Sequence, residues 1–486
     1  MSPVSPALPS VQACSAAQLD SPSDAPVEPG LLPLTAEIRP EGLAVGGVLL
    51  EQLARQHGTP LFVYDEEHLR SRCREAVAAF GPGNVAYAAK AFLCTAMARL
   101  VADEGLLLDV ASGGELRTAL YAGVEPDRIV LHGNNKDDAE LRTAMTAGVH
   151  HIVVDSFDEL ERIERLHHVE GLPPARIRLR VAPGVAAGAH EAIRTGGHDS
   201  KFGFGLADGA ASAAVRRAAA SSAVRLEGVH AHVGSQVLDP AELADGAAAV
   251  ARFAVDCAAE SGAESAVDGA VTRAITGLTV GGGLGAAYVG GQQAPSLAVW
   301  AERVHAAVRG AGWTGRVGVE PGRSIAARAG LTLYRVGTVK RIPDVRTYVS
   351  VDGGMSDNLR PALYGARYEA FLPRRPEAPR PQRARLVGKH CESGDVIIDD
   401  AALPDDLRVG DLLATPVTGA YGYAMASNYN KLPRPAVVFV RDGRARLVVR
   451  RETEYDLLRL DVAGEGPQRS APDLATPDPA TAQRGA

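Results

Sequence analysis

Lys90 is the first residue in this chain that suggests chemistry, because it ends a run of apolar and aromatic residues. The stretch is VAYAAKAF, residues 85–92. Its first residues have the character of a buried strand, whereas a primary amine avoids a protein core. One interpretation is a lysine that leaves the sheet with its head in water. The other is an amine held at a strand end for covalent chemistry with a carbonyl compound.

A glycine-rich loop, GGGLG at residues 281–285, offers backbone N–H groups to an anion. A dinucleotide site would need such a loop to open the first βαβ unit of the chain. Here the loop follows the seventh of a series of strand-like runs, which favours a phosphate site in a barrel. Ser235, in HAHVGSQ, is a second candidate phosphate donor.

Two histidines and a carboxylate stand at other strand ends. His230 and His232 share one face of a strand, which suggests a metal pair, but a stacked or hydrogen-bonded histidine is the favoured interpretation. Glu320, in VGVEPGR, lies on an apolar strand and therefore needs a partner. That partner is either Arg323, in a salt bridge, or a protonated heterocyclic nitrogen. His150 and His151 are interpreted as surface residues.

The elements that must position these groups are short β-rich runs separated by helical segments. Strands that alternate with helices predict parallel pairing. Eight such units favour a closed (β/α)8 barrel, a TIM barrel, over an open doubly wound sheet. In a barrel the polar residues at the strand ends gather at one mouth, where active sites are built. The runs are VAYAAK (85–90), LLLDVA (106–111), RIVLHG (128–133), HIVVDS (151–156), IRLRVAP (177–183), GVHAHVGS (228–235), LTVGGG (278–283) and RVGVEPG (316–322).

The pattern changes on either side of the barrel, which is expected to span residues 65–328. Residues 329–463 alternate between apolar runs and turns and predict a C-terminal antiparallel β domain. Residues 34–64 contain short strand-like pieces that are expected to pair with that domain. Residues 1–33 and 464–486 have the composition of disordered arms, and residues 261–275 that of a loop insertion.

The bulk composition excludes several classes of function. The chain has 486 residues, 46% of them hydrophobic, so it can bury a core of two domains or so. A net charge of −7 with both signs dispersed does not match a nucleic-acid or membrane surface. Five scattered cysteines argue against a disulfide framework and a structural zinc site, and favour a cytoplasmic protein.

Together these groups match the needs of pyridoxal 5'-phosphate. Its aldehyde needs a lysine, its phosphate needs donors, its ring needs a flat cover, and its ring nitrogen needs an anion to stay protonated. Lys90 supplies the amine, and the 281–283 loop and Ser235 supply the phosphate donors. His232 supplies the flat cover for the ring, and Glu320 supplies the anion. We therefore expect Lys90 to carry the cofactor, and we expect no metal.

Residues from about 34 to 462 also resemble the diaminopimelate decarboxylases, whose alanine-racemase-like fold is shared with the eukaryotic ornithine decarboxylases. The resemblance rests on ordered blocks along the chain: YAAKAF, LDVASGGEL, HGNNK, TGGHDSKFGFG, GVHAHVGSQ, GGGLG, EPGRS, DGGMSDNLRPALYG, GKHCESGD and GAYGYAM. It implies a pyridoxal phosphate barrel with a β domain, in a head-to-tail homodimer with shared active sites. It also implies decarboxylation of meso-2,6-diaminopimelate to L-lysine and CO2, the last step of lysine biosynthesis.

The resemblance further implies a role for each matching residue. Lys90 is the implied Schiff-base lysine, and His232 is implied to lie over the ring. The implied phosphate contacts are Ser235, Gly281, Gly282 and Gly283. The other implied cofactor contacts are Glu320, Pro321, Gly322, Arg323 and Tyr421. Substrate contacts fall to Arg323, Arg360, Tyr364, Glu392 and Tyr421, and Cys391 is the implied proton donor. Cys391 and Glu392 are implied to act across the dimer interface.

Other functions remain open at this point. The nearest is a related decarboxylase acting on ornithine, lysine or carboxynorspermidine. An amino-acid racemase is expected to carry an arginine in place of Glu320. A non-catalytic pyridoxal phosphate-binding module would lack the β domain with Arg360 and Glu392. A nicotinamide dehydrogenase would not show the yellow colour of a lysine-bound cofactor. For Arg360 the alternative is an ordinary surface ion pair.

Overall fold

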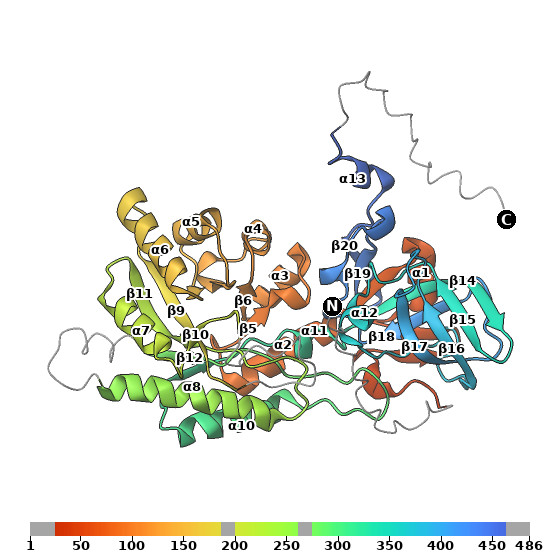
Figure 1. The fold of residues 1–486 in the computed structure, drawn as a ribbon. Coiled ribbons are helices and arrows are strands. Elements are labelled where there is room, and N and C mark those ends of the chain that lie inside the picture. Colours follow the sequence, from red (N-terminus) through yellow and green to blue (C-terminus); the bar gives the residue numbers. More distant parts are fainter. Residues whose placement is uncertain (1–24, 186–199, 261–274, 463–486) are drawn as a thin grey trace, which may run out of the picture.

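The computed structural model describes residues 25–185, 200–260 and 275–462. Most of the two terminal arms, nearly all of the 261–275 insertion and part of the TGGHDS block lie outside the described residues. Figure 1 shows two bodies, a barrel on the left and a β domain on the right. Among the described residues, the search for a helix long and apolar enough to cross a membrane found none. Four cysteines are described, and all four are free thiols.

Eight parallel strands form the barrel, one from each run predicted above. The strands pair in chain order, and a parallel bridge between Val85 and Val319 joins the last to the first. The sheet is therefore closed, and the open doubly wound alternative is wrong. The strands are β5 (Ala86–Ala88), β6 (Leu107–Val110), β7 (Ile129–Leu131), β8 (His151–Val154), β9 (Ala175–Ala182), β11 (Val224–His230), β12 (Gly277–Thr279) and β13 (Arg316–Gly318), with β10 (Phe204–Gly205) added beside β9.

Helices surround the barrel, and side-chain caps fix where several of them begin. Ser112, Asp137 and Ser156 each accept a hydrogen bond from the third residue beyond, so each helix starts soon after a strand ends. His132, between β7 and the Asp137 cap, is thereby held at the barrel mouth. The helices are α2 (Glu66–Phe80), α3 (Thr95–Asp103), α4 (Gly113–Tyr121), α5 (Asp138–Ala147), α6 (Phe157–Glu170), α7 (Ala210–Ala220), α8 (Pro240–Glu260) and α10 (Leu297–Gly310), with the short turns η2 (Ala89–Ala91) and η3 (Pro126–Arg128).

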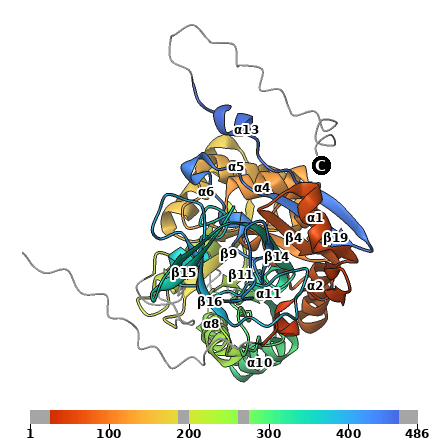
Figure 2. The ribbon, with the colours of Figure 1, turned by 90° about the vertical axis from the view of Figure 1, so that its right-hand side faces the viewer.

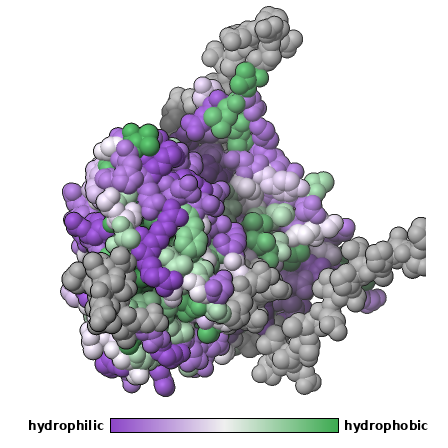
Figure 3. Space-filling model, turned by 60° about the vertical axis from the view of Figure 1, so that its left-hand side comes forward, coloured by the Kyte–Doolittle hydropathy of each residue, from purple (hydrophilic) through white to green (hydrophobic). Residues whose placement is uncertain are grey.

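Each barrel helix buries one face and leaves the other in water. In α2 the buried residues Leu69, Cys73, Ala76 and Phe80 recur at the spacing of one helical face. Phe80 packs edge-on against Trp300 of α10, with ring centroids 4.9 Å apart. Hydrophilic residues dominate the barrel face seen in Figure 3, with apolar ones interspersed among them.

The second body is a mixed sheet rather than a purely antiparallel one. Most ladders are antiparallel, but β15 runs parallel to β16 and β4 runs parallel to β19. Parallel neighbours need a long connection, and about thirty residues containing α12 separate β15 from β16. The strands are β4 (Leu61–Asp65), β14 (Gly330–Ile342), β15 (Arg346–Val351), β16 (Gln382–Val387), β17 (Val396–Leu403), β18 (Leu412–Pro416), β19 (Ala436–Arg441) and β20 (Arg444–Val449).

The N-terminal segment enters this sheet through β4, which lies between β14 and β19. Ahead of it, β1 (Glu37–Arg39), β2 (Gly42–Val45) and β3 (Val48–Leu49) form a small antiparallel sheet. The remaining short elements are η1 (Pro29–Leu31), α1 (Leu50–His57), α11 (Arg323–Ala326), α12 (Arg360–Tyr364), η5 (Tyr423–Met425), η6 (Tyr429–Lys431) and α13 (Glu454–Leu458).

The β domain lies against one end of the barrel. Seen from that side, its strands cover the middle of the molecule and the barrel helices surround them (Figure 2). Tyr64 of β4 stacks on Phe92 at 4.3 Å, and its hydroxyl donates a hydrogen bond to the Gly419 carbonyl. The Tyr421 N–H donates to the carbonyl of Ala91 at 2.8 Å, so the seam holds Tyr421 beside the Lys90 turn.

Candidate active site

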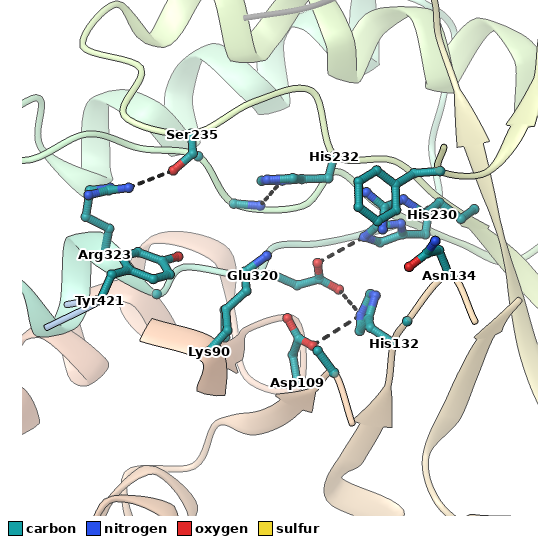
Figure 4. A pocket seen from close by; sticks show the side chains of 18 of the residues that line it. Lys90, Asp109, His132, Asn134, His230, His232, Ser235, Glu320, Arg323 and Tyr421 are labelled. Atoms are coloured by element: carbon teal, nitrogen blue, oxygen red, sulfur yellow. Dashed lines mark hydrogen bonds and ion pairs between the residues drawn. The ribbon is translucent and has the colours of Figure 1, made fainter. Parts of the chain in front are cut away.

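A cavity of about 350 Å³ lies at the carboxyl ends of the barrel strands, within the size range of small-ligand sites. Figure 4 shows the side chains that line it. Ten of the residues named from the sequence do so: Lys90, His232, Ser235, Gly282, Gly283, Glu320, Gly322, Arg323, Tyr364 and Tyr421. The other five, Gly281, Pro321, Arg360, Cys391 and Glu392, are not among the lining residues.

Lys90 lies just after β5, in the turn η2, rather than in the strand itself. The alanines on either side, Ala89 and Ala91, are buried and fix the turn, while the lysine side chain is exposed. Figure 4 shows that side chain pointing into the cavity, with Glu320 close by. A backbone held on both sides therefore presents a primary amine to the cavity.

Glu320 is buried, and two imidazoles bind its carboxylate. The Nε2 atom of His132 lies 3.0 Å from Oε1, and that of His230 lies 3.0 Å from Oε2 (Figure 4). Burial favours the neutral acid, but the charge of His132 and the hydrogen bonds of both histidines outweigh it and hold the pKa of Glu320 well below its usual range. Arg323 is bound elsewhere, so the salt-bridge alternative for Glu320 is wrong. The carboxylate faces the cavity as an anion.

The opposite wall of the cavity gathers donors suited to a phosphate. Arg323 donates from Nη2 to the Ser235 hydroxyl at 2.9 Å and from Nη1 to the Tyr288 hydroxyl at 2.6 Å. Its guanidinium carbon also lies 4.8 Å from the centre of the Tyr421 ring. The Ser235 hydroxyl, the Arg323 guanidinium and the Tyr421 ring thus form one side of the site, and Tyr288, outside the lining residues, binds the guanidinium.

The glycine loop fits tightly between neighbouring strand ends. A Cβ on Gly281, whose φ is +69°, would lie 2.6 Å from Nδ1 of His232. One on Gly282 would lie 2.2 Å from the Glu320 carbonyl oxygen, and one on Gly283 2.5 Å from that of Gly234. Larger residues would therefore displace the backbone of the site.

His232 lies two residues beyond the end of β11 rather than in the strand. Gly282 donates its N–H to the imidazole Nδ1 at 3.3 Å. Burial, with the nearby charge of Lys90, holds the pKa of His232 well below its usual value. The ring is therefore neutral and fixed in orientation, as a flat cover for an aromatic ligand requires.

Arg360 is buried at the start of α12, so the surface ion-pair alternative is wrong. Its guanidinium lies 4.2 Å from the centre of the Tyr288 ring and 5.5 Å from that of Tyr368, and Nη1 donates to the Tyr368 hydroxyl. Tyr364, one turn later, reaches the cavity. Arg360 is not among the lining residues, and it shares Tyr288 with Arg323.

Cys391 and Glu392 are exposed in the loop between β16 and β17. Asp395 holds this loop by accepting the N–H groups of His390 at 2.9 Å and Met355 at 2.6 Å. Neither Cys391 nor Glu392 lines the cavity of its own chain.

Sequence reasoning gave no role to several residues that the fold brings here. Asp109 and His132 lie within the predicted runs LLLDVA and RIVLHG but have no predicted role, although the HGN stretch after β7 is a usable signal. The expectation that His151 is a surface residue is wrong, because it is buried and binds Glu227 at 2.8 Å at the opposite end of the barrel. His230 lines the cavity as the hydrogen-bonded histidine that the sequence favoured. The lining residues without a predicted role are Ala88, Asp109, Ala111, His132, Gly133, Asn134, Arg180 and Phe202.

The fold and this donor set define a class, the pyridoxal phosphate-dependent decarboxylases. The site fits the cofactor, because an amine, a hydroxyl with a guanidinium, a neutral imidazole and an ionised carboxylate surround one cavity. The family model for the pyridoxal binding domain of pyridoxal-dependent decarboxylases matches residues 66–327. Within that class, the chain belongs to the family of the diaminopimelate decarboxylases, because members of that family are 42–49% identical to it over 86% of its length.

The comparisons with individual proteins agree on this family. The diaminopimelate decarboxylase of Mycobacterium tuberculosis is 49% identical over 431 residues, covering 86% of this chain and 95% of that protein. The structure of the Helicobacter pylori diaminopimelate decarboxylase complexed with L-lysine is similar, with a TM-score of 0.76, 32% identity and coverage of 84% of this chain and 98% of that one. A lysine/ornithine decarboxylase from Vibrio vulnificus, with a TM-score of 0.67 and 24% identity, shows the same fold.

Proposed function

We propose that this protein catalyses the pyridoxal phosphate-dependent decarboxylation of meso-2,6-diaminopimelate to L-lysine and CO2. The observation that carries the proposal is the ionised Glu320, held by two imidazoles beside the Lys90 amine. When bound, the cofactor supplies an electron sink for the charge left at Cα after CO2 departs. The anion at Glu320 keeps the ring nitrogen protonated, and the sink depends on that proton.

The remaining residues of the cavity bind and orient. Ser235, Arg323 and the glycine loop hold the phosphate, His232 covers the ring, and Tyr421 closes the side nearest Lys90. Support for these roles comes from the shared cavity and from the Arg323–Ser235 hydrogen bond.

The preference for diaminopimelate rests on the distal end of the substrate. Diaminopimelate carries a second carboxylate, which suits a forked guanidinium such as Arg360. Ornithine and lysine carry only the distal amine. Arg360 has a buried Nε with no hydrogen-bond partner among the described residues, and Tyr364 extends from the same short helix into the cavity. We infer that these two residues recognise the distal carboxylate.

The test uses three separate reactions, in which the purified chain and pyridoxal phosphate are incubated together with meso-diaminopimelate, L-ornithine or L-lysine. We expect L-lysine and CO2 in equal amounts from the first, and a kcat/KM at least about 100-fold lower with the others, as for a charged site left unpaired. Preferential turnover of ornithine or lysine would assign the chain to the rival decarboxylases. Release of D-amino acids without CO2 would make it a racemase.

We further infer a homodimer in which Cys391 and Glu392 complete the partner's site, with Cys391 as the proton donor to Cα and Glu392 binding the distal amine. Their exposure, and their absence from the cavity of their own chain, support this arrangement. The exposed Cys391 thiol also favours a location in the cytoplasm, where reducing conditions keep such a thiol free.

Hybrid dimers test the sharing of sites. Lys90→Ala and Glu392→Ala should each be nearly inactive when refolded alone. When they are refolded together, each hybrid carries one site with both lesions and one with neither. Random pairing makes about half of the dimers hybrids, so up to about a quarter of wild-type activity should return. If tagged hybrids form and no activity returns, each site is built within one chain.

A further inference from the structure

His132 lies between two carboxylates inside the barrel. Its Nε2 atom is 3.0 Å from Oε1 of Glu320 and 3.6 Å from Oδ1 of Asp109. Asp109 comes from β6, His132 follows β7 and Glu320 follows β13, so barrel closure brings the three together. All three are at least nine-tenths buried, with exposures of 6% for Asp109, 8% for His132 and 8% for Glu320.

The charges of this cluster follow from the contacts. Burial alone would lower the pKa of His132, but the carboxylates of Asp109 and Glu320 outweigh it and raise the pKa above its usual value. Burial instead lowers the pKa of His230 to about 4, although Glu320 opposes the shift. His132 is therefore the imidazolium of the cluster, and His230 is a neutral donor. The charged and titratable groups around His132 are Asp109 on β6, Arg180 on β9, His230 on β11, Glu320 after β13 and Lys90 after β5.

A metal ion is the rival explanation, because the ligand atoms of His132, His230 and Glu320 all lie within 4.8 Å of one another. A metal-bound imidazole donates its second N–H to an acceptor. Nδ1 of His230 is buried and has no hydrogen-bond partner among the described residues. A neutral imidazole that donates from Nε2 leaves this atom as a lone pair without a proton. The site therefore suits hydrogen bonding to Glu320 better than metal coordination.

We propose that His132 is a positioning residue that keeps Glu320 ionised and its carboxylate fixed toward the cofactor ring. This inference rests on the proposed function for its effect on turnover, but not for its effect on Glu320 itself. Burial raises the pKa of Asp109 to about 6, so above that pH, with His132 charged, the cluster of Asp109, His132 and Glu320 carries one net negative charge. That charge balances a single proton on the ring nitrogen. A neutral residue at position 132 would leave two carboxylates facing each other, and one of them would take up a proton.

The first experiment needs neither cofactor nor turnover. The imidazoles of the full chain, with ¹³C-labelled histidine, are titrated by NMR, and the His132 signal is assigned by its loss in His132→Gln. We expect His132 to titrate above its ordinary pKa and to lose its proton at a lower pH in Glu320→Gln. If His132 titrates below its ordinary pKa, or is unmoved in Glu320→Gln, the proposal is overturned.

The second experiment measures the reaction. His132→Gln, which can keep an N–H donor but not the charge, should lower kcat about 10- to 100-fold, with KM changed less than about threefold. The apparent acid pKa of its kcat profile should rise, because Glu320 then protonates more easily. His151→Gln is the matched control, since it also removes a buried histidine paired to a glutamate but lies outside the cavity. A normal kcat in His132→Gln, or an equal loss in His151→Gln, would overturn the proposal. Failure of the wild-type chain to act on diaminopimelate would reject the proposed function and leave the NMR result standing.

Discussion

Replacing Tyr288 with phenylalanine should loosen cofactor binding without disturbing Arg360. The hydroxyl of Tyr288 accepts a hydrogen bond from Arg323 Nη1 at 2.6 Å, and its ring lies 4.2 Å from the Arg360 guanidinium. Phenylalanine removes the first contact and keeps the second. A hydrogen bond to a charged group contributes about 1.5–3 kcal/mol. The cofactor dissociation constant should therefore rise about 10- to 150-fold.

Tyr368→Phe is the natural counterpart, because it removes the hydroxyl that Arg360 contacts and leaves Arg323 intact. In that variant the KM for diaminopimelate should rise while the cofactor dissociation constant stays unchanged. Cofactor binding is followed by visible absorbance during titration with pyridoxal phosphate, and KM by release of CO2. Thermal melting of both variants checks that the fold is retained. If Tyr288→Phe binds the cofactor as the wild type does, or if the two variants exchange phenotypes, the assignment of the two arginines is wrong.

Three further outcomes are expected. Lys90→Ala should lose nearly all turnover and show no visible absorbance of bound cofactor, because Lys90 is the only lysine among the described residues that line the cavity. A pyridoxyl label that maps to another lysine after borohydride reduction would contradict this. Arg360→Ala should lower kcat/KM for diaminopimelate by the equivalent of about 2–5 kcal/mol through KM, leaving cofactor absorbance intact. Burial lowers the pKa of His68 to about 3 and the pKa values of His151 and His230 to about 4. Below about pH 6.5 the unfolded chain therefore binds up to three more protons at these histidines than the folded chain does. The free energy of unfolding should then drop by up to about 4 kcal/mol per pH unit near pH 5, measured in urea, whereas a flat profile between pH 7 and 5 would contradict the neutral burial of these rings.

The sequence was enough to predict the barrel and to place Lys90, Ser235 and Glu320 near one another. The reason is topological, since parallel strands in a closed barrel bring their carboxyl ends to one mouth whatever the details of packing. The predicted ends of two strands differ from those in the structure. His232 and Glu320 each lie two residues beyond the strands that were expected to end at them.

The partners of these residues could not be predicted in the same way. The contact of His132 with Glu320 depends on how β7 and β13 face each other across the barrel, which no local pattern encodes. The burial of Arg360 between two tyrosine rings depends on how the β domain docks on the barrel. The roles of Cys391 and Glu392 remain predictions, because they concern a second chain.

The position of β4 has a consequence for how the chain folds during synthesis. This strand lies in the middle of the β-domain sheet, yet the whole barrel separates it in sequence from β14 and β19. As the chain leaves the ribosome, the barrel residues are complete before either neighbour of β4 has been made. Both edges of an apolar strand, LFVYD, must therefore wait unpaired, and such edges promote aggregation. Because this pairing is so distant in sequence, completing the β domain should be the slow step of folding, and the nascent chain is most vulnerable just before β14 emerges.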